Sequence, residues 1–164
     1  MNIAFDAAAI LGASRQRGMG YYVKQLMCHM IKQDKSNKYY FFNCLEPYHL
    51  FAEARPNLQE DYFYLGNKLM LGEHRELNCI YSNLLRRYLR DNNIDVFIIT
   101  VPFAIGPGVR MPQGGHLPLY EENWFEGCRV VAIAYDLIPK LFSDLYLRSS
   151  AVAENYERQH KQLQ

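Results

Sequence analysis

The sequence has almost no excess charge, because 18 lysines and arginines stand against 17 aspartates and glutamates, for a net charge of +1. A chain with so little net charge has no bulk attraction to nucleic acid, so we expect no nucleic-acid partner. It has no apolar run long enough to cross a membrane, and no basic-then-apolar segment of the signal-peptide type near its start. We therefore expect a cytoplasmic protein.

Metal-ligand patterns are also missing. The four cysteines form no CxxC pair, and none of the five histidines stands at ligand spacing from another. This pattern favours neither a zinc site nor a disulfide framework, and it fits a reducing compartment. No GxxxxGK[ST] sequence occurs, which excludes P-loop chemistry. We expect no metal and no resident cofactor.

Short apolar runs alternate with helical patterns along the chain. The runs predict strands at residues 2–6, 39–44, 62–65, 95–99 and 130–134. Apolar residues at helical spacing, and the breaks that flank them, predict helices at residues 18–31, 47–54, 77–90 and from about 149 onward. Such alternation is typical of a parallel sheet with helices on both faces. We predict one Rossmann-like α/β domain of three layers (α/β/α), with a mostly parallel sheet, over residues 1–164.

The run 130–134 ends in Tyr135 and Asp136, which a proline-terminated turn follows. We expect a buried parallel strand that delivers this pair to its carboxyl end, the rim at which open α/β sheets bind ligands. Tyr135 can hydrogen-bond a substrate or fill the cleft wall. Asp136 can act as a catalytic carboxylate, bind sugar hydroxyls, or cap the turn, since Asp readily bonds backbone N–H groups two residues on. Asp6, at the end of the first strand, has the same alternatives.

Gly18 and Gly20 stand where a loop leads into a helix, a position from which backbone N–H groups can face a phosphate. The alternative is that they only let the chain turn sharply into the helix. Val23 occupies the third glycine position of the dinucleotide fingerprint, which weakens a nicotinamide-binding interpretation. His116 lies in the long glycine- and proline-rich connection at 100–127, which we expect to overhang the rim.

Three segments, in this order, resemble the N-terminal domain of family 4 glycosyltransferases of the GT-B fold. They are residues 2–6, which end in an aspartate, residues 17–26, with a glycine–apolar–glycine helix start, and residues 130–142, with a strand that leads into Asp-Leu-Ile-Pro. Residues 95–97 also fit the penultimate strand of that domain. The resemblance implies transfer of a sugar from a nucleotide-sugar donor, with retention of configuration and without a metal, in polysaccharide or glycoconjugate synthesis.

The resemblance also implies roles for particular residues. Gly18 and Gly20 would lie near the donor phosphates or the transferred sugar, and the loops 7–17 and 100–127 would shape the acceptor pocket. The family's frequent histidine before Asp-Leu-Ile-Pro is Tyr135 here, whose phenol can donate a comparable hydrogen bond. The residues implied are, for catalysis, Tyr135 and Asp136 and, for substrate binding, Asp6, Arg15, Arg17, Gly18, Gly20 and His116.

One departure concerns the family's arginine after the second glycine, which is Tyr21 here. That basic contact is missing unless Arg15 or Arg17 replaces it. A second basic group stands on the helix predicted at 77–90, whose arginines lie outside its apolar stripe, at Arg86, Arg87 and Arg90. Such a face is most often solvated, and it is also typical of helices that contact anionic lipid headgroups.

In such enzymes the N-terminal domain holds the acceptor and a C-terminal domain holds the donor. We therefore expect this chain to be a piece that stops before its donor-binding domain and that is inactive alone. The expected partners are that domain, a carbohydrate or lipid-linked acceptor, the inner membrane face as a peripheral contact, and a second copy through uncovered apolar surface. Two alternatives stay open: a non-enzymatic α/β module that binds a nucleotide or a protein, and an NAD-dependent oxidoreductase domain.

Overall fold

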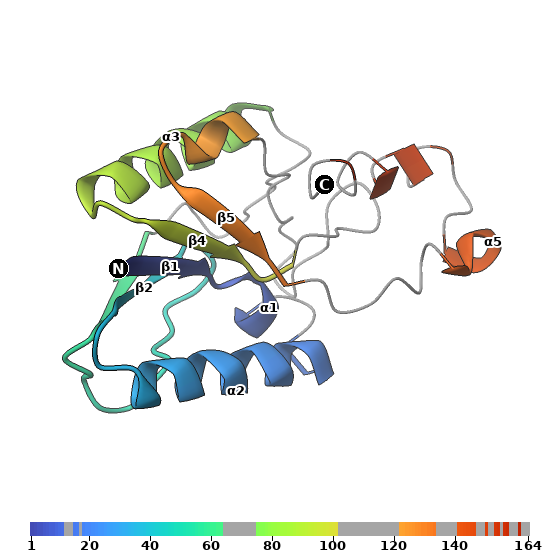
Figure 1. Cartoon of the computed structure of the whole chain (residues 1–164). Helices are drawn as coiled ribbons and strands as arrows, with labels where there is room; N and C mark the ends of the chain where they lie inside the picture. Colours follow the sequence, from blue (N-terminus) through green and yellow to red (C-terminus); the bar gives the residue numbers. More distant parts are fainter. Residues whose placement is uncertain are drawn as a thin grey trace.

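A sheet of five parallel strands forms the centre of the molecule (Figure 1). In the computed structural model the strands are β1 (Asn2–Asp6), β2 (Lys38–Asn43), β3 (Leu58–Tyr62), β4 (Val96–Ile99) and β5 (Arg129–Ala132). The helices whose bounds fall within the described residues are α1 (Ala8–Leu11), α2 (Gly18–Gln33), α3 (Arg75–Asp91), the 3-10 helix η1 (Glu122–Phe125) and α5 (Ser143–Tyr146). The structure describes residues 1–11, 15–16, 18–63, 75–101, 122–133, 141–146, 150, 153–154, 156–157 and 161.

The strands lie in the order β3-β2-β1-β4-β5, and every neighbouring pair is parallel. Helices α1 and α2 cover one face of the sheet, while α3 and η1 cover the other (Figure 1). Each helical layer closes its own hydrophobic core against the sheet. The predicted Rossmann-like α/β fold of three layers, with a parallel sheet, is therefore confirmed.

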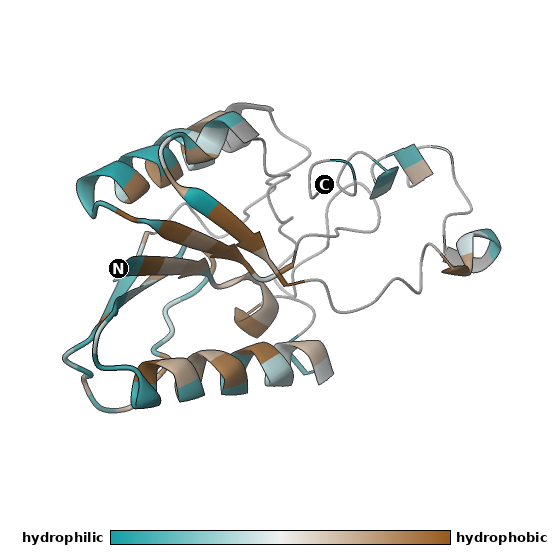
Figure 2. Ribbon diagram, in the orientation of Figure 1, coloured by the Kyte–Doolittle hydropathy of each residue, from teal (hydrophilic) through white to brown (hydrophobic). Residues whose placement is uncertain are grey.

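The central strands are apolar on both faces, and their side chains alternate between the two cores. Phe5 and Phe41 are fully buried on the α2 side, with ring centroids 5.1 Å apart. Phe42 and Phe97 are buried on the α3 side. In Figure 2 these strands are largely brown between helices of mixed colour. Since burial of one large apolar side chain stabilises a fold by about 1.5–3 kcal/mol, these continuous runs hold the sheet between its helices.

Both long helices present one apolar stripe to the sheet, as their sequence periodicity predicts. In α2, Val23, Met27 and Ile31 recur every four residues and are fully buried. In α3, Leu85 and Leu89 are buried, whereas the three predicted basic positions are exposed, at Arg86, Arg87 and Arg90. The helices predicted at residues 18–31 and 77–90 are therefore confirmed.

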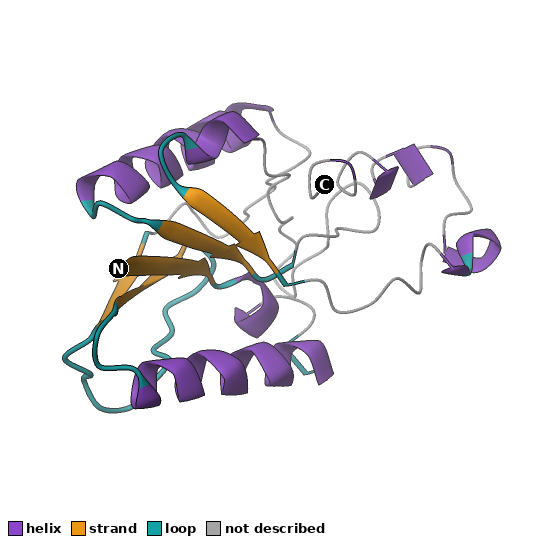
Figure 3. Cartoon of the chain, in the orientation of Figure 1, coloured by secondary structure: helices purple, strands orange, loops and turns teal. Residues whose placement is uncertain are grey.

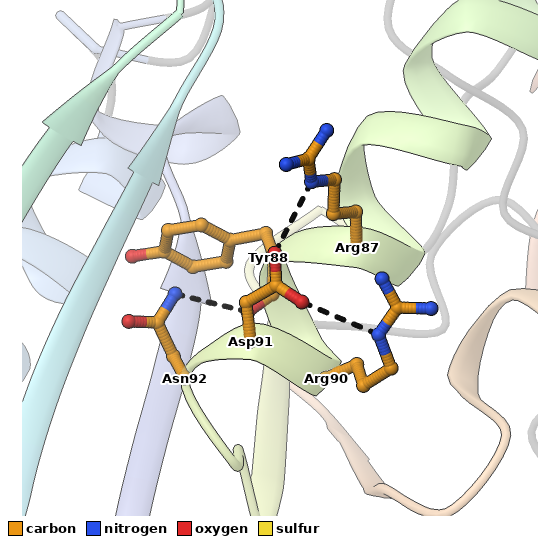
Figure 4. A network of polar contacts seen from close by, with 5 residues as sticks. All are labelled: Arg87, Tyr88, Arg90, Asp91 and Asn92. Atoms are coloured by element: carbon orange, nitrogen blue, oxygen red, sulfur yellow. Dashed lines mark hydrogen bonds and ion pairs between the residues drawn. The ribbon is translucent and has the colours of Figure 1, made fainter.

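Helix α3 ends at the polar run Asp91-Asn92-Asn93. The Asp91 carboxylate accepts hydrogen bonds of 3.2 Å from Nε of Arg87 and from Nε of Arg90 (Figure 4). The Asn92 side chain donates to a backbone carbonyl one turn earlier, at 3.0 Å. Asn93 then has φ of 48°, in the left-handed region that asparagine enters more easily than most residues.

The helix predicted at residues 47–54 is wrong. The connection from β2 to β3, which we call the β2–β3 crossover (residues 44–57), contains no helix and packs on the α2 side of the sheet (Figure 3). Side chains satisfy its backbone instead, since Asn43 bonds an amide and a carbonyl of the crossover at 2.9 and 2.7 Å. Glu60 of β3 likewise accepts from the Leu50 amide at 2.9 Å. Such side-chain bonds compete with a helical backbone ladder.

Three further expectations need correction. The strand predicted at 62–65 is β3, which lies earlier because pairing with β2, rather than apolar composition, defines it. The strand predicted at 130–134 is β5, which is parallel as predicted but is not buried. Its Val130 and Val131 side chains are 41% and 48% exposed. Among the described strands, β5 lies at an edge of the sheet. The helices that cover the centre of the sheet therefore leave β5 exposed. The segment 7–17, predicted as a loop, contains α1.

Candidate functional site at the carboxyl rim

The carboxyl ends of β1 and β4 lie side by side at the point where the winding of the sheet reverses. From β1 the chain proceeds outward through β2 to β3, whereas β4 and β5 extend the sheet on the other side. Reversals of this kind open a crevice beyond the strand ends, where α/β proteins bind ligands. Helix α2 begins on the side to which the strand arrows point and runs back along the sheet (Figure 1).

Asp6 is the predicted site residue that the structure places most firmly at this rim. It ends β1 with only 2% of its surface exposed. Its carboxylate accepts hydrogen bonds from the amide of Ala8 at 2.9 Å and from the amide of Thr100 at 3.2 Å. The Thr100 hydroxyl also donates to this carboxylate and accepts from the Ala9 amide at 3.0 Å. These contacts favour the capping role among the alternatives for Asp6, and its substrate-binding role stays a prediction.

The same contacts join two distant parts of the chain. Thr100 follows β4 and is fully buried, so its side chain ties the end of β4 to the turn after β1. All four residues of α1 are buried beneath this junction. Hydrogen bonds to an ionised carboxylate are stronger than neutral ones, and burial strengthens them further. The floor of the rim is therefore a fixed platform of backbone amides around one carboxylate.

Gly18 opens α2 and is exposed, and a Cβ added there would meet no atom within 4 Å. Neither crowding nor a left-handed backbone therefore requires glycine at this position. Gly20, by contrast, is buried. The first turn of α2 carries no acidic side chain, which leaves the positive end of the helix dipole uncompensated by a local carboxylate. The start of α2 is thus suited to an anion, which the N–H groups of its first turn can bind.

Arg15 lies just before this helix and is partly exposed. Its Nη1 donates to Oε1 of Glu46, at 3.1 Å, and the two side chains are 42% and 26% exposed. A pair this open to solvent contributes little to stability. Its effect is positional, because it links the segment before α2 to the first residues of the β2–β3 crossover. A guanidinium in an exposed ion pair remains able to exchange partners with an incoming anion.

Four predicted site residues lie outside the described residues: Arg17, His116, Tyr135 and Asp136. The path toward the last two is nevertheless defined up to residue 133. Strand β5 follows β4 until Ala132 stands opposite Ile99, and the Ile133 amide donates to the Ile99 carbonyl at 3.0 Å. The chain therefore still runs toward the same rim at Ile133.

Metal-ligating side chains do not gather in the described part of the chain, where no group of three or more His, Cys, Asp or Glu residues could hold an ion. All four cysteines carry free thiols. Burial raises the pKa of Cys44 far above its ordinary value and that of Cys128 to about 11. These two thiols are therefore protonated near neutral pH and poorly suited to nucleophilic attack.

A second concave feature, which the sequence did not indicate, lies away from the rim beside the β2–β3 crossover. It is a cavity of about 440 Å³ lined by crossover residues and by the inner side chains of β3, Leu58 and Glu60. The predicted helix at 47–54 would have turned these side chains differently. Its only signal in the sequence is a cluster of charged and aromatic residues between Tyr48 and Arg55.

Among the described helices, none is both long and apolar enough to pass through a membrane. Comparison of the chain with protein-family models, with curated proteins and with solved structures finds no match in any of the three. What the chain does must therefore be argued from the rim itself.

Proposed function

We propose that this chain is the acceptor-side domain of a retaining, nucleotide-sugar-dependent glycosyltransferase that acts in polysaccharide or glycoconjugate synthesis. One observation carries the proposal: the point between β1 and β4 at which the winding of the sheet reverses lies on the side where α2 starts, and β5 leads toward the same edge of the sheet. The described parts of β1, α2 and β5, which are far apart in sequence, thus support a common rim for the segments that resemble family 4 glycosyltransferases.

The start of α2 supports a role in leaving-group stabilisation. In sugar transfer the bond between the anomeric carbon and the donor phosphate breaks, and negative charge develops on the departing nucleoside diphosphate. Backbone N–H groups at a helix start, with the positive end of its dipole, stabilise such charge without a metal. Gly18 would leave room for the phosphates at this start, and Arg15 or Arg17 would supply the positive side chain.

Tyr135 and Asp136 are the proposed catalytic residues at the other edge of the rim. Asp136 would accept a hydrogen bond from a sugar hydroxyl, and the Tyr135 phenol would donate one to the transferred sugar. Asp6 and the fixed platform around it would shape the floor, with His116 above the acceptor. A donor-binding C-terminal domain would complete the cleft, and the exposed arginines of α3 would touch the membrane of a lipid-linked acceptor.

The test uses the complete gene product incubated with a panel of nucleotide sugars, with release of nucleoside diphosphate followed by chromatography. We expect release with at least one donor, and a loss of about 10- to 100-fold in Asp136→Asn, since a hydrogen bond to a charged group contributes about 1.5–3 kcal/mol. Glu126→Gln is the matched control, because Glu126 is exposed and precedes β5 at the opposite edge of the sheet. It should retain full activity.

Other results would contradict the proposal. Equal activity of Asp136→Asn and the wild-type enzyme, with both folded by circular dichroism, would remove Asp136 from the site. Tight NAD binding without nucleotide-sugar turnover would favour an oxidoreductase domain. Turnover of neither class by the complete gene product would favour a binding module.

A further inference from the structure

Helix α2 carries two exposed tyrosines near its start. Tyr21 is 66% exposed and Tyr22 is 54% exposed, whereas the tyrosines of β2 and those of α3 are buried. The helix begins on the side to which the strands point, so both tyrosines lie toward the rim formed by the carboxyl ends of β1 and β4 (Figure 1). Single exposed rings are common on protein surfaces, but adjacent ones beside a crevice are typical of a binding surface.

Helical spacing puts the two tyrosines on one face with Gly18. Positions 18, 21, 22 and 25 of α2 are spaced i, i+3, i+4 and i+7, which defines a single face of an α-helix. Side chains of a helix lean toward its N-terminus, so those of Tyr21 and Tyr22 lean over the turn that Gly18 begins. A Cβ added at Gly18 would meet no atom within 4 Å. The space beside Gly18, on the face of the tyrosines, is therefore open.

The four side-chain positions of this face are uncharged. They comprise a glycine, two phenols and the amide of Gln25, which is partly exposed. Of the described cations that flank the face in the sequence, Arg15 donates to Glu46 at 3.1 Å, and Nζ of Lys24 lies 5.7 Å from the centroid of the Tyr48 ring. The face therefore offers aromatic area with neutral hydrogen-bonding groups and no fixed charge of its own.

A sugar ring is chemically complementary to such a face. One side of a pyranose presents C–H groups that pack on an aromatic ring, while its hydroxyls both donate to and accept from phenols and amides. An anionic lipid or an acidic peptide would instead need fixed positive charge. An aliphatic protein surface would bury the phenols and the amide without hydrogen-bond partners, which is unfavourable.

We propose that Tyr21 and Tyr22 stack on the sugar rings of a neutral carbohydrate acceptor, which occupies the open space beside Gly18. This inference rests on the proposed glycosyltransferase function and narrows its acceptor to one that is recognised through uncharged sugar rings. The donor phosphates would meet the N–H groups at the end of the helix axis, whereas the saccharide would lie along the outer side of the first two turns. The two ligands would thus occupy different sides of the same helix start.

The experiment measures binding of maltohexaose, cellohexaose and chitohexaose to the full chain by saturation-transfer difference NMR, without any nucleotide sugar. We expect saturable binding of at least one of these neutral oligosaccharides. Tyr21→Ala and Tyr22→Ala should each weaken it by about three- to tenfold, because one stacking ring is lost. Tyr21→Phe should retain most of the affinity, since it keeps the ring. Ile80→Ala is the matched control, because Ile80 is 51% exposed on α3, over the opposite face of the sheet, and it should bind like the wild-type protein.

Gly18→Leu tests the open space without removing a ring. Its side chain would fill that space, and it should fold normally because no atom lies within 4 Å of the added Cβ. We expect it to lose saturable binding. Equal affinities of the wild-type protein, both alanine variants and Gly18→Leu would overturn the proposal, as would the absence of saturable binding of all three oligosaccharides. A wild-type dimer in analytical ultracentrifugation that Tyr21→Ala dissociates would assign the face to a second copy and also overturn it.

Release of nucleoside diphosphate by the complete gene product is a separate measurement, so the two proposals can fail independently. Oligosaccharide binding that the variants lose, without turnover of any nucleotide sugar, would retain the sugar-binding face and overturn the transferase. Turnover of a nucleotide sugar with oligosaccharide binding unchanged in every variant would overturn only the sugar-binding face.

Discussion

The hydroxyl of Thr100 gives the sharpest test of how the rim is built. Thr100→Val keeps the shape of this fully buried side chain but removes its hydroxyl. The Ala9 amide then lacks its acceptor, which costs about 1–3 kcal/mol, and the Asp6 carboxylate loses one charge-assisted hydrogen bond, worth about 1.5–3 kcal/mol. Asp6 keeps the bonds from two backbone amides. We therefore expect the free energy of unfolding to fall by about 2.5–6 kcal/mol.

Urea unfolding at 25 °C, followed by far-ultraviolet circular dichroism, measures this change. Thr100→Ser is the control, because it keeps both hydrogen bonds and removes one buried methyl group. It should lose only about 1 kcal/mol. A Val variant within 1 kcal/mol of the wild-type protein would refute the assignment, and so would a Ser variant that is destabilised as much as Val. Either result would mean that shape, and not hydrogen bonding, holds the ends of β1 and β4 together.

Two further predictions concern the turn after α2 and the packing of α3. Asp34 accepts hydrogen bonds from Asn37, from the Tyr39 hydroxyl and from Ser36, which together hold the pKa of its carboxyl well below its usual value. The stabilising effect of the ionised Asp34 carboxylate is therefore complete above about pH 4 and is lost as the pH falls further. The difference in stability between the wild-type protein and Asp34→Asn, measured by thermal unfolding, should shrink from pH 6 to pH 3. A constant difference would contradict this. Leu85→Ala leaves a cavity at a fully buried position of α3 and should lower the free energy of unfolding, measured in urea, by about 2–5 kcal/mol. Leu84→Ala, at the half-buried neighbour, should lower it clearly less. Equal losses would contradict the assignment of Leu85 to the core.

The pattern of apolar residues in the sequence was sufficient to predict the strands and helices whose own side chains form the core. Strands β1, β2 and β4 are continuous apolar runs, and α2 and α3 carry their stripes at helical spacing. These elements define the layers, so the fold class followed from the sequence. A common rim at the carboxyl ends of the strands followed as well, because parallel strands joined by crossovers bring these ends to one edge.

The errors fall where neighbours, rather than the local sequence, decide the structure. Strand β3 is largely polar and exists because its backbone pairs with β2 and because Asp61 accepts from the Tyr88 hydroxyl at 2.7 Å. The crossover at 44–57 avoids a helix because Asn43 and Glu60, which flank it, bond its backbone. Neither set of contacts leaves a periodic trace in the sequence.

The candidate site shows the same division. The sequence placed Asp6 correctly at a strand end but could not distinguish a cap from a ligand, because its partner Thr100 stands 94 positions away in the chain. The two cations at the Phe51 ring, Lys32 and Arg55, could not be assembled from the sequence either. Lys32 comes from a helix and Arg55 from an irregular crossover, and only the packing of that crossover brings them to one ring.

The central position of β1 has a consequence for how the protein is made. Ile3 stands opposite Tyr39 on one side and opposite Val96 on the other. During synthesis β1 can pair with β2 early, while its second edge stays bare until β4 emerges, roughly 3–10 s later at about 5–20 residues per second. A bare apolar edge is a template for pairing with another nascent chain. A strand that is paired on both edges in the finished molecule is thus exposed to wrong pairing on the ribosome, and synthesis rate and chaperone supply should affect the yield of the protein.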